Sequence, residues 1–267
     1  TKACVMTYGF GKTADVRGLK IKTSDLRGSS FDVVCDGTRL SLRLGLPGMP
    51  AVAEDNIVAR DIALAELTGA RLHIAHLSTR GSVELVRRAK EKGLPVTAEV
   101  TPHHLTLTEE RVLGGKGASP HMAYDTNAKV NPPLRTRQDI ESLLQGLKDG
   151  TIDAIATDHA PHTREDKMVE FVSAEFGISG LETALGSLMG LVHSGQLELK
   201  TLISKLTVEP ARIIGRKELG SLKPGNEADI TIFDPEAEWV VETEHFASKG
   251  KNTPLAGTVL KGKVMAT

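Results

Sequence analysis

Three groups of imidazole and carboxylate side chains follow three short apolar stretches of the chain, each of strand length. The grouping is uneven along the sequence, because seven of the nine histidines fall between positions 73 and 162. In a parallel α/β sheet the carboxyl ends of the strands lie at one edge, so side chains placed there share one site. The groups are His76 after 71–75, His103 and His104 after 94–100, and Asp158, His159 and His162 after 153–157.

Imidazole and carboxylate together are the donors that hold Zn²⁺ in hydrolytic sites. Bound zinc lowers the pKa of its water toward neutrality and so supplies a hydroxide nucleophile. A carboxylate beside that water can carry its proton to the leaving group. The pattern therefore predicts a metal-assisted hydrolase.

Simpler interpretations exist for several of these residues. His73 lies three residues before His76, so on a strand the two side chains point to opposite faces and His73 is predicted to be structural. His103 and His104 are adjacent, so at least one of them is expected to pack or hydrogen-bond. Asp158 can equally be a helix N-cap. The remaining histidines lack partners at useful spacing and are predicted at the surface or in the core: His121, His193 and His245.

Alternating strands and helices from about residue 45 predict an α/β fold, a parallel sheet or barrel, followed by a small β module. We divide the chain into an unassigned segment 1–44, a barrel portion 45–219 and a β portion 220–267. The first 44 residues show no clear periodicity. Strands are expected at 71–76, 94–100, 153–157, 228–233 and 257–264, and helices at 53–68, 81–92, 137–148, 181–193, 198–206 and 208–214.

Composition excludes several other classes. The formal net charge is −1, with 25% charged and 40% hydrophobic residues, which argues against nucleic acid as the main partner. No apolar run approaches the ~18–20 residues of a membrane helix, and no signal peptide opens the chain. Cys4 and Cys35 form no disulfide framework, which fits the cytoplasm. A phosphate loop ending at Lys12-Thr13 fails at Met6, and a dinucleotide fingerprint is absent.

Several blocks of the sequence resemble class I bacterial dihydroorotases, in family order from about Ser41 to the end. Hydantoinases and allantoinases share the fold and metal site, but the AKVNPPLR and TDHAPH combination is similar to dihydroorotase in particular. The blocks are RLHIAHLST (71–79), VTAEVTPHHL (96–105), NAKVNPPLR (127–135), DAIATDHAPH (153–162), FGISGLET (176–183) and GNEADITIFD (225–234).

The resemblance implies an amidohydrolase (β/α) barrel with a small β-sandwich. It also implies zinc-dependent, reversible cyclisation of N-carbamoyl-L-aspartate to L-dihydroorotate in pyrimidine biosynthesis, with one or two zinc ions per site. The resemblance further implies a small-molecule substrate and either a homodimer or an assembly with a transcarbamoylase. Carried over by motif, His76 and Asp158 would be zinc ligands, Asp158 also the general acid/base, and Asn131, His162, Phe176 and Gly177 would bind substrate.

The sequence departs from the family pattern on its N-terminal side. The family's first barrel strand ends in a His-x-His pair, and no histidine precedes His73. Asp36 only faintly echoes the bridging-carboxylate segment. We therefore expect an incomplete barrel, because its last three strands alone leave exposed edges. Three explanations stay open: a missing N-terminal half, a non-catalytic homologue, or elements borrowed from a partner. A hydantoinase- or allantoinase-like hydrolase is the second enzymatic interpretation.

Overall fold

A computed structural model describes residues 49–113, 124–216 and 218–267, together with the backbone of four N-terminal strands. The chain divides into two compact units, residues 1–50 and 51–267. The predicted boundaries at 44 and 219 stay predictions, as do Asp36, Cys4 and His121, which lie outside the described residues.

The N-terminal unit contains a four-stranded sheet in the order β1-β2-β3-β4. β1 pairs with β2 in parallel, and the other pairs are antiparallel. No structure was predicted for this segment, and its four strands are Tyr8–Gly9, Val16–Ser24, Gly28–Cys35 and Thr38–Arg43.

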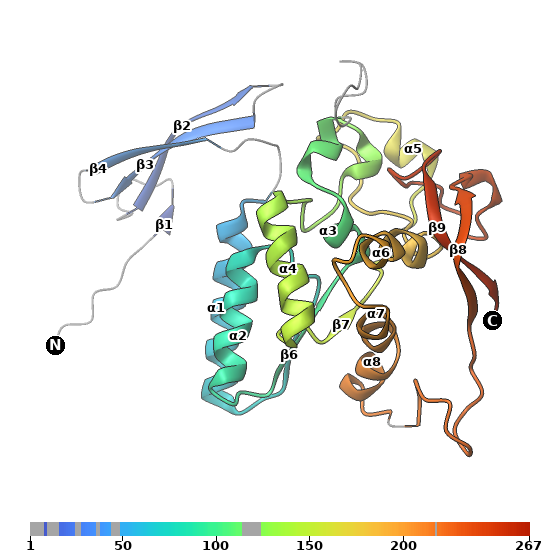
Figure 1. The fold of residues 1–267 in the computed structure, drawn as a ribbon. Helices are drawn as coiled ribbons and strands as arrows, with labels where there is room; N and C mark the ends of the chain where they lie inside the picture. The colour runs from blue at the N-terminus through green and yellow to red at the C-terminus, as the bar shows by residue number, and fades with distance from the viewer. Residues whose placement is uncertain are drawn as a thin grey trace. The chain divides into compact units, whose positions relative to one another are not determined.

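The larger unit is built around three parallel strands in the order β5-β6-β7. Helix α2 connects the first pair and α4 stands before the third strand, so the chain follows the predicted strand–helix alternation. Helices α1, α2 and α4 stand side by side in Figure 1 and pack against one another in that order. The bounds are α1 Ala51–Thr68, β5 Leu72–Ile74, α2 Arg80–Glu91, β6 Val96–Val100, α4 Arg137–Asp149 and β7 Ala154–Ile155.

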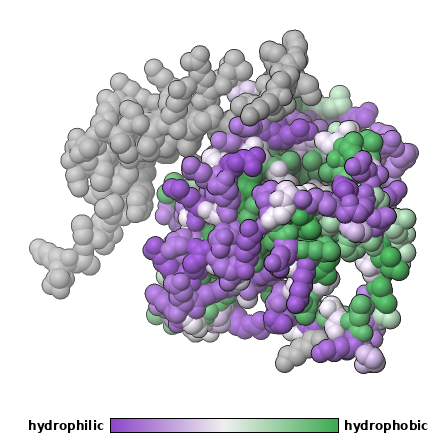
Figure 2. Space-filling view, viewed as in Figure 1, coloured by the Kyte–Doolittle hydropathy of each residue, from purple (hydrophilic) through white to green (hydrophobic). Residues whose placement is uncertain are grey.

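The helices begin and end where local chemistry dictates. The Thr79 side chain accepts from the Ser82 backbone N–H and begins α2. Thr136 and Asp139 cap each other reciprocally at the start of α4, and Gly150, with φ 83°, ends that helix. Helices α2 and α4 each bury one apolar stripe, whereas α1 leaves Val52, Ile57, Leu64 and Leu67 exposed. Figure 2 shows that hydrophilic residues cover much of the described surface in this view.

The core lies between this sheet and its helices. Strand β6 alternates, with Val96, Ala98 and Val100 buried on the core side, so Thr97 and Glu99 face the other way. The largest side chains with no exposure include Leu143 and Leu147 of α4, and Ile152, which precedes β7. Strand pattern and helix stripe therefore agree on a single face of the sheet.

In the described part of the chain, no helix has the length and apolar character needed to cross a membrane. The rest of the unit contains shorter elements. β8 and β9 form an antiparallel pair that packs on α6. The strand predicted at 228–233 is wrong for its first four residues, which pair with no described strand, and β8 begins at Ile232. The elements are α3 Pro102–Thr106, α5 Arg164–Lys167, α6 Ala184–His193, α7 Leu199–Leu206, α8 Val208–Ile213, β8 Ile232–Val240, β9 Val259–Ala266, and the 3₁₀ helices Glu109–Leu113, Thr126–Ala128 and Thr243–His245.

Candidate active site at the carboxyl ends of the parallel strands

The structure brings His76 and Asp158 together at one edge of the parallel sheet. His76 lies two residues beyond β5 and Asp158 three beyond β7. The His76 Nε2 is 3.7 Å from an Asp158 carboxylate oxygen, and both side chains are about one-quarter to one-third exposed, at 30% and 26%. Two sequence-predicted ligands from different strands therefore face each other.

Both residues also hold an unusual backbone conformation. His76 has φ 54° and Asp158 has φ 47°; Tyr124 is the one other non-glycine residue with positive φ in the described part of the chain. The left-handed region costs a non-glycine residue about 1–3 kcal/mol, and such strain gathers at functional sites. His and Asp are among the side chains that tolerate it best. The strain therefore marks the same two positions as the sequence pattern.

Glu99 lies between two histidines and was missed in the sequence. Its carboxylate oxygens are 3.2 Å from His73 Nε2 and 2.9 Å from His76 Nδ1. Burial alone raises the pKa of Glu99, but the two imidazoles outweigh burial and bring it to about 2. In turn the Glu99 carboxylate raises the pKa of His76. Burial acts in the opposite direction, and the negative charge of Asp158 adds to the increase. Its placement on the outward face of β6 was the available signal.

His73 and His104 are fully engaged in structural contacts. His73 Nδ1 hydrogen-bonds Thr97 Oγ1 at 2.8 Å. His104 accepts from Thr101 Oγ1 at 2.7 Å through Nδ1 and donates to the Pro132 carbonyl at 2.9 Å through Nε2. Burial lowers the pKa of His104 to about 4, so the ring is neutral at pH 7. Of the adjacent pair, His104 is thus the packing residue.

His103 is the unengaged member of that pair. It is 5% exposed, and its ring lies 4.6 Å from that of His104, centroid to centroid. Among the described residues, His103 Nε2 and His76 Nδ1 are the two buried side-chain nitrogens without a hydrogen-bond partner. The 2.9 Å contact of His76 Nδ1 with Glu99 is close but lacks hydrogen-bond geometry. Burial lowers the pKa of His103 well below its ordinary value, which leaves a neutral imidazole.

These orphaned nitrogens test whether the site suits a metal. A buried polar atom without a partner is rare and calls for an explanation such as an ion. Imidazole nitrogens and a carboxylate match the donor preference of zinc, so the side chains of His76, His103 and Asp158 fit a share of such a centre. Within the described ranges, no three His, Cys, Asp or Glu side chains are close enough to form a complete group. The described residues thus offer some of the donors that a metal centre would need, and not a complete set.

Three of the four predicted substrate-binding residues, His162, Phe176 and Gly177, lie together in the structure. His162 Nε2 donates to the Phe176 carbonyl at 2.8 Å, and Gly177 N donates to Lys129 O at 2.9 Å. Gly177 has φ 144°, and a Cβ there would lie 2.6 Å from Ala160 Cβ. Only glycine allows this close approach. Asn131, two residues beyond Lys129, is exposed.

Asn252 ties these segments together and was not anticipated from the sequence. It is 4% exposed. Its Oδ1 accepts from His162 N at 2.8 Å and from Ser179 Oγ at 2.7 Å. Its Nδ2 donates to the carbonyls of Ala160 and Gly177, each at 3.0 Å. All four of its partners lie more than 70 residues away in the chain, which no local motif reveals.

Two buried lysines complete this part of the site. Lys129 Nζ donates to Val172 O at 3.0 Å and lies 4.3 Å from the centre of the Phe176 ring. Lys167 Nζ donates to the carbonyls of Thr126 and Glu175 at 3.1 and 2.6 Å. Burial, with the nearby charge of Lys129, lowers the pKa of Lys167 to about 8. The ammonium groups thus hold the Phe176 segment against the segment that leads to Asn131.

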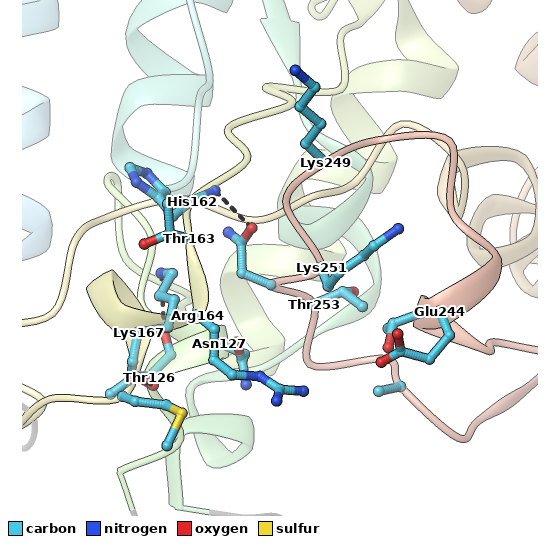
Figure 3. A pocket seen from close by; sticks show the side chains of 14 residues that line it. Thr126, Asn127, His162, Thr163, Arg164, Lys167, Glu244, Lys249, Lys251 and Thr253 are labelled. Atoms are coloured by element: carbon cyan, nitrogen blue, oxygen red, sulfur yellow. Dashed lines mark hydrogen bonds between the residues drawn. The ribbon is translucent and has the colours of Figure 1, made fainter.

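A cavity of about 520 Å³ opens beside His162 (Figure 3). The hydrogen bond from the His162 backbone N–H, drawn as a dashed line, lies along its wall. None of His76, His103 and Asp158 lines it, so it adjoins the strand-end site without containing the predicted metal donors. Its charged lining is mostly basic: Arg164, Lys167, Lys249, Lys251 and Glu244.

Comparison with known proteins agrees with this geometry. The chain is 52% identical over 264 residues to a dihydroorotase of Thermoanaerobacter sp. strain X514, covering 98% of this chain and 58% of that protein. It is 55% identical over 229 residues to a dihydroorotase of Pelotomaculum thermopropionicum, covering 85% of this chain and 51% of that protein. The chain therefore spans somewhat more than half the length of these relatives.

Solved structures of related enzymes share the fold. The dihydropyrimidinase of Brevibacillus agri matches with a TM-score of 0.73 and 26% identity, over 80% of this chain and 47% of that one. The L-hydantoinase of Arthrobacter aurescens matches with a TM-score of 0.72 and 30% identity, over 81% of this chain and 48% of that one. The sequence pattern of the amidohydrolase family matches residues 49–265. The chain thus has an amidohydrolase-type fold and belongs to the amidohydrolase family.

Proposed function

We propose that this chain carries the His76, His103 and Asp158 side of a zinc-dependent dihydroorotase centre. One observation supports it above the others: His76 Nε2 lies 3.7 Å from the Asp158 carboxylate, and the buried Nε2 of His103 has no hydrogen-bond partner among the described residues. The chain is also about 50% identical to proteins named dihydroorotase. The remaining metal donors would come from outside the described residues.

The proposed reaction is the reversible closure of N-carbamoyl-L-aspartate to L-dihydroorotate, with release of water. When bound, zinc would polarise the reacting carbonyl and lower the pKa of water. Asp158 would take the proton from the attacking water and deliver it to the ring nitrogen that leaves, and would run in reverse during closure. Glu99, at 2.9 Å from His76 Nδ1, would orient that imidazole.

Substrate contacts are assigned to the neighbouring segments. Asn131 would hydrogen-bond the amide edge of the ring, and the backbone at Phe176 and Gly177 would close the pocket. His162 would bind the substrate carboxylate. Because its Nε2–H is engaged by the Phe176 carbonyl, the contact to a carboxylate falls to Nδ1, which donates only in the imidazolium form.

The finer architecture follows from the same proposal. Strands β5–β7 would be part of a (β/α) barrel over residues 45–219, and residues 220–267 part of a small β-sandwich, with 1–44 as a separate segment. Pyrimidine synthesis would place the protein in the cytoplasm, as a homodimer or with a transcarbamoylase. Light scattering of the purified chain, alone and with a transcarbamoylase, tests the assembly.

A second candidate is a hydantoinase-like hydrolase, which the structural similarity to a dihydropyrimidinase and to hydantoinases favours. The test of both is elemental analysis of the 267-residue chain purified without chelators, followed by assays on dihydroorotate, hydantoin and dihydrouracil. We expect about one to two zinc per chain and hydrolysis of dihydroorotate alone. Turnover of hydantoin or dihydrouracil in its place would favour the second candidate. Absence of bound zinc would overturn the metal centre.

A further inference from the structure

Glu54 is a buried carboxylate with an unusual set of partners. It lies in the first turn of α1 and is 7% exposed. It accepts from Ser78 N at 2.9 Å, from Thr79 N at 3.2 Å and from the Ser78 hydroxyl. A carboxylate at a helix start normally serves that helix's own N–H groups. Here the donors come from the turn that directly follows His76.

This turn, residues 76–79, is pinned at consecutive amides. Leu77 N donates to Glu99 O at 2.9 Å, and Ser78 N donates to Glu54. The Leu77 amide belongs to the peptide plane that sets ψ of His76, and the Ser78 amide belongs to the next plane, so the two bonds fix the turn directly after His76. Left-handed backbone at a non-glycine residue persists only where the surroundings over-determine it. Glu54 therefore holds the turn that directly follows His76, whose own φ is 54°.

Arg135 extends the same network to the substrate side. Its Nε donates to Ser78 Oγ at 2.9 Å, and its guanidinium is 3.5 Å from the Glu54 carboxylate, with both side chains about one-tenth exposed. Arg135 ends the Asn131–Arg135 segment, so one buried ion pair contacts both the His76 turn and the segment that carries Asn131. Burying two charges is costly, and their mutual contacts and hydrogen bonds offset that cost.

We propose that Glu54 and Arg135 are positioning residues that hold the His76 turn, and with it the His76 ring, in register with Asp158. This proposal rests on the proposed metal centre for its consequence, because a misplaced ring would weaken metal binding. Contacts that orient metal ligands typically change affinity by about 10–100-fold when removed.

The test compares four variants of the full 267-residue chain: Glu54→Ala, Glu54→Gln, Ser78→Ala and, as matched control, Val58→Ala. Val58 lies four residues after Glu54 on the same helix and is 4% exposed. Its apolar side chain cannot hydrogen-bond to residues 76–79, so it controls for a general loss of stability. Two quantities are measured: the dissociation constant for Co²⁺, followed by its visible absorbance, and the NMR Cα shift of His76, which reports left-handed backbone.

We expect Glu54→Ala to weaken Co²⁺ binding by about 10–100-fold and to move the His76 Cα shift away from its left-handed value. Glu54→Gln should recover part of both, because its amide oxygen still accepts from Ser78 N. Ser78→Ala should weaken binding several-fold, since it removes the hydroxyl between Glu54 and Arg135. Val58→Ala should lower the melting temperature while leaving both readouts at wild-type values.

Wild-type readouts in a folded Glu54→Ala would overturn the proposal, as would equal losses in Val58→Ala. If Glu54→Ala does not fold, Glu54→Gln and Ser78→Ala decide by the same criteria. A wild-type chain that binds no Co²⁺ would refute the metal centre instead. The His76 shift then decides alone: movement in the Glu54 variants supports positioning of the turn, and no movement refutes it.

Discussion

The two ends of the β5–β7 sheet are built on opposite principles. At the amino end of β7, the Asp153 carboxylate accepts from Lys90 Nζ at 2.6 Å and from Ala98 N at 2.9 Å, and Lys205 Nζ donates to the Ile152 carbonyl at 2.5 Å. At the carboxyl end, His76 and Asp158 have left-handed backbone, and buried imidazole nitrogens lack partners. The polar groups at the amino end therefore have hydrogen-bond partners, whereas two imidazole nitrogens at the carboxyl end have none in the described part of the chain.

This difference separates stability from chemistry along the strands. Polar groups that form hydrogen bonds lower the free energy of the folded chain, whereas buried polar groups without a partner raise it. A ligand that binds the unpartnered groups can offset this cost. In barrel enzymes the catalytic residues lie at the carboxyl ends of the strands, and residues at the amino ends mainly stabilise the fold. Substitutions at the two ends should therefore have separable effects.

The largest effect is expected from Asp158→Asn, which should reduce dihydroorotate turnover by roughly 10²–10⁴-fold through loss of the proton carrier. Asparagine tolerates the left-handed backbone, so the melting temperature should hardly change. Steady-state hydrolysis and thermal unfolding measure the two quantities. Asp153→Asn, at the other end of β7, should instead lower stability by about 1–3 kcal/mol and leave kcat unchanged. Full turnover in Asp158→Asn would contradict the assignment.

The adjacent histidines should separate in the same way. His103→Ala is expected to lower zinc affinity by at least about 100-fold, more than the loss of an outer contact, and its cost in stability comes from lost packing against the His104 ring. His104→Ala should leave zinc affinity near wild type but cost about 1–3 kcal/mol, because it strands the Thr101 hydroxyl and the Pro132 carbonyl. Competition titration with a zinc chelator and urea unfolding report on each. Equal zinc losses in both variants would refute the distinction.

Ile152→Ala probes the stabilising end directly. Ile152 has no exposed surface and lies just before Asp153, so truncation should cost about 2–5 kcal/mol in unfolding free energy. Urea denaturation measures the loss. Zinc affinity of the folded fraction should equal that of the wild type. A parallel loss of zinc binding would show that the two ends are coupled.

Lys167 gives the smallest and most specific effect, a pH dependence of stability. Its pKa is about 8 in the folded chain and near 10.5 when unfolded, so the folded chain binds fewer protons between these values. Its contribution is therefore fully present above pH 10.5 and is lost as the pH falls through 8. Relative to Lys167→Met, the wild-type unfolding free energy should rise across this window by up to about 3 kcal/mol. Lys200→Met, at an exposed position of α7, should keep the wild-type pH dependence.

Local signals account for most of what the sequence predicted. The helix predicted over 137–148 is observed at Arg137–Asp149, because a capping box and an apolar stripe are both readable within its own residues. The placement of His76 and Asp158 at one edge followed from the parallel strand order alone. These inferences needed no knowledge of distant partners.

The remaining features depend on contacts between distant segments. Whether His103 or His104 is satisfied is decided by the Pro132 carbonyl, 28 residues beyond His104. Glu99 and Asn252 act through partners in other segments, so neither stands out in a motif. The N-terminal strands are a different case, because β2 and β4 contain the alternations Leu19-Lys20-Ile21-Lys22 and Leu40-Ser41-Leu42-Arg43, a local signal that the prediction did not use. The start of β8 depends on its pairing with β9.

The left-handed backbone at His76 and Asp158 also limits how this chain can change during evolution. β-branched and bulky side chains are disfavoured at φ near +50°, whatever the enzyme does. A lineage released from selection for catalysis would still be held to the few residues that this backbone accepts, chiefly Gly, Asn, Asp and His. Asn or Gly at these two positions would therefore record a loss of activity, and retained His and Asp would distinguish working descendants from silent ones.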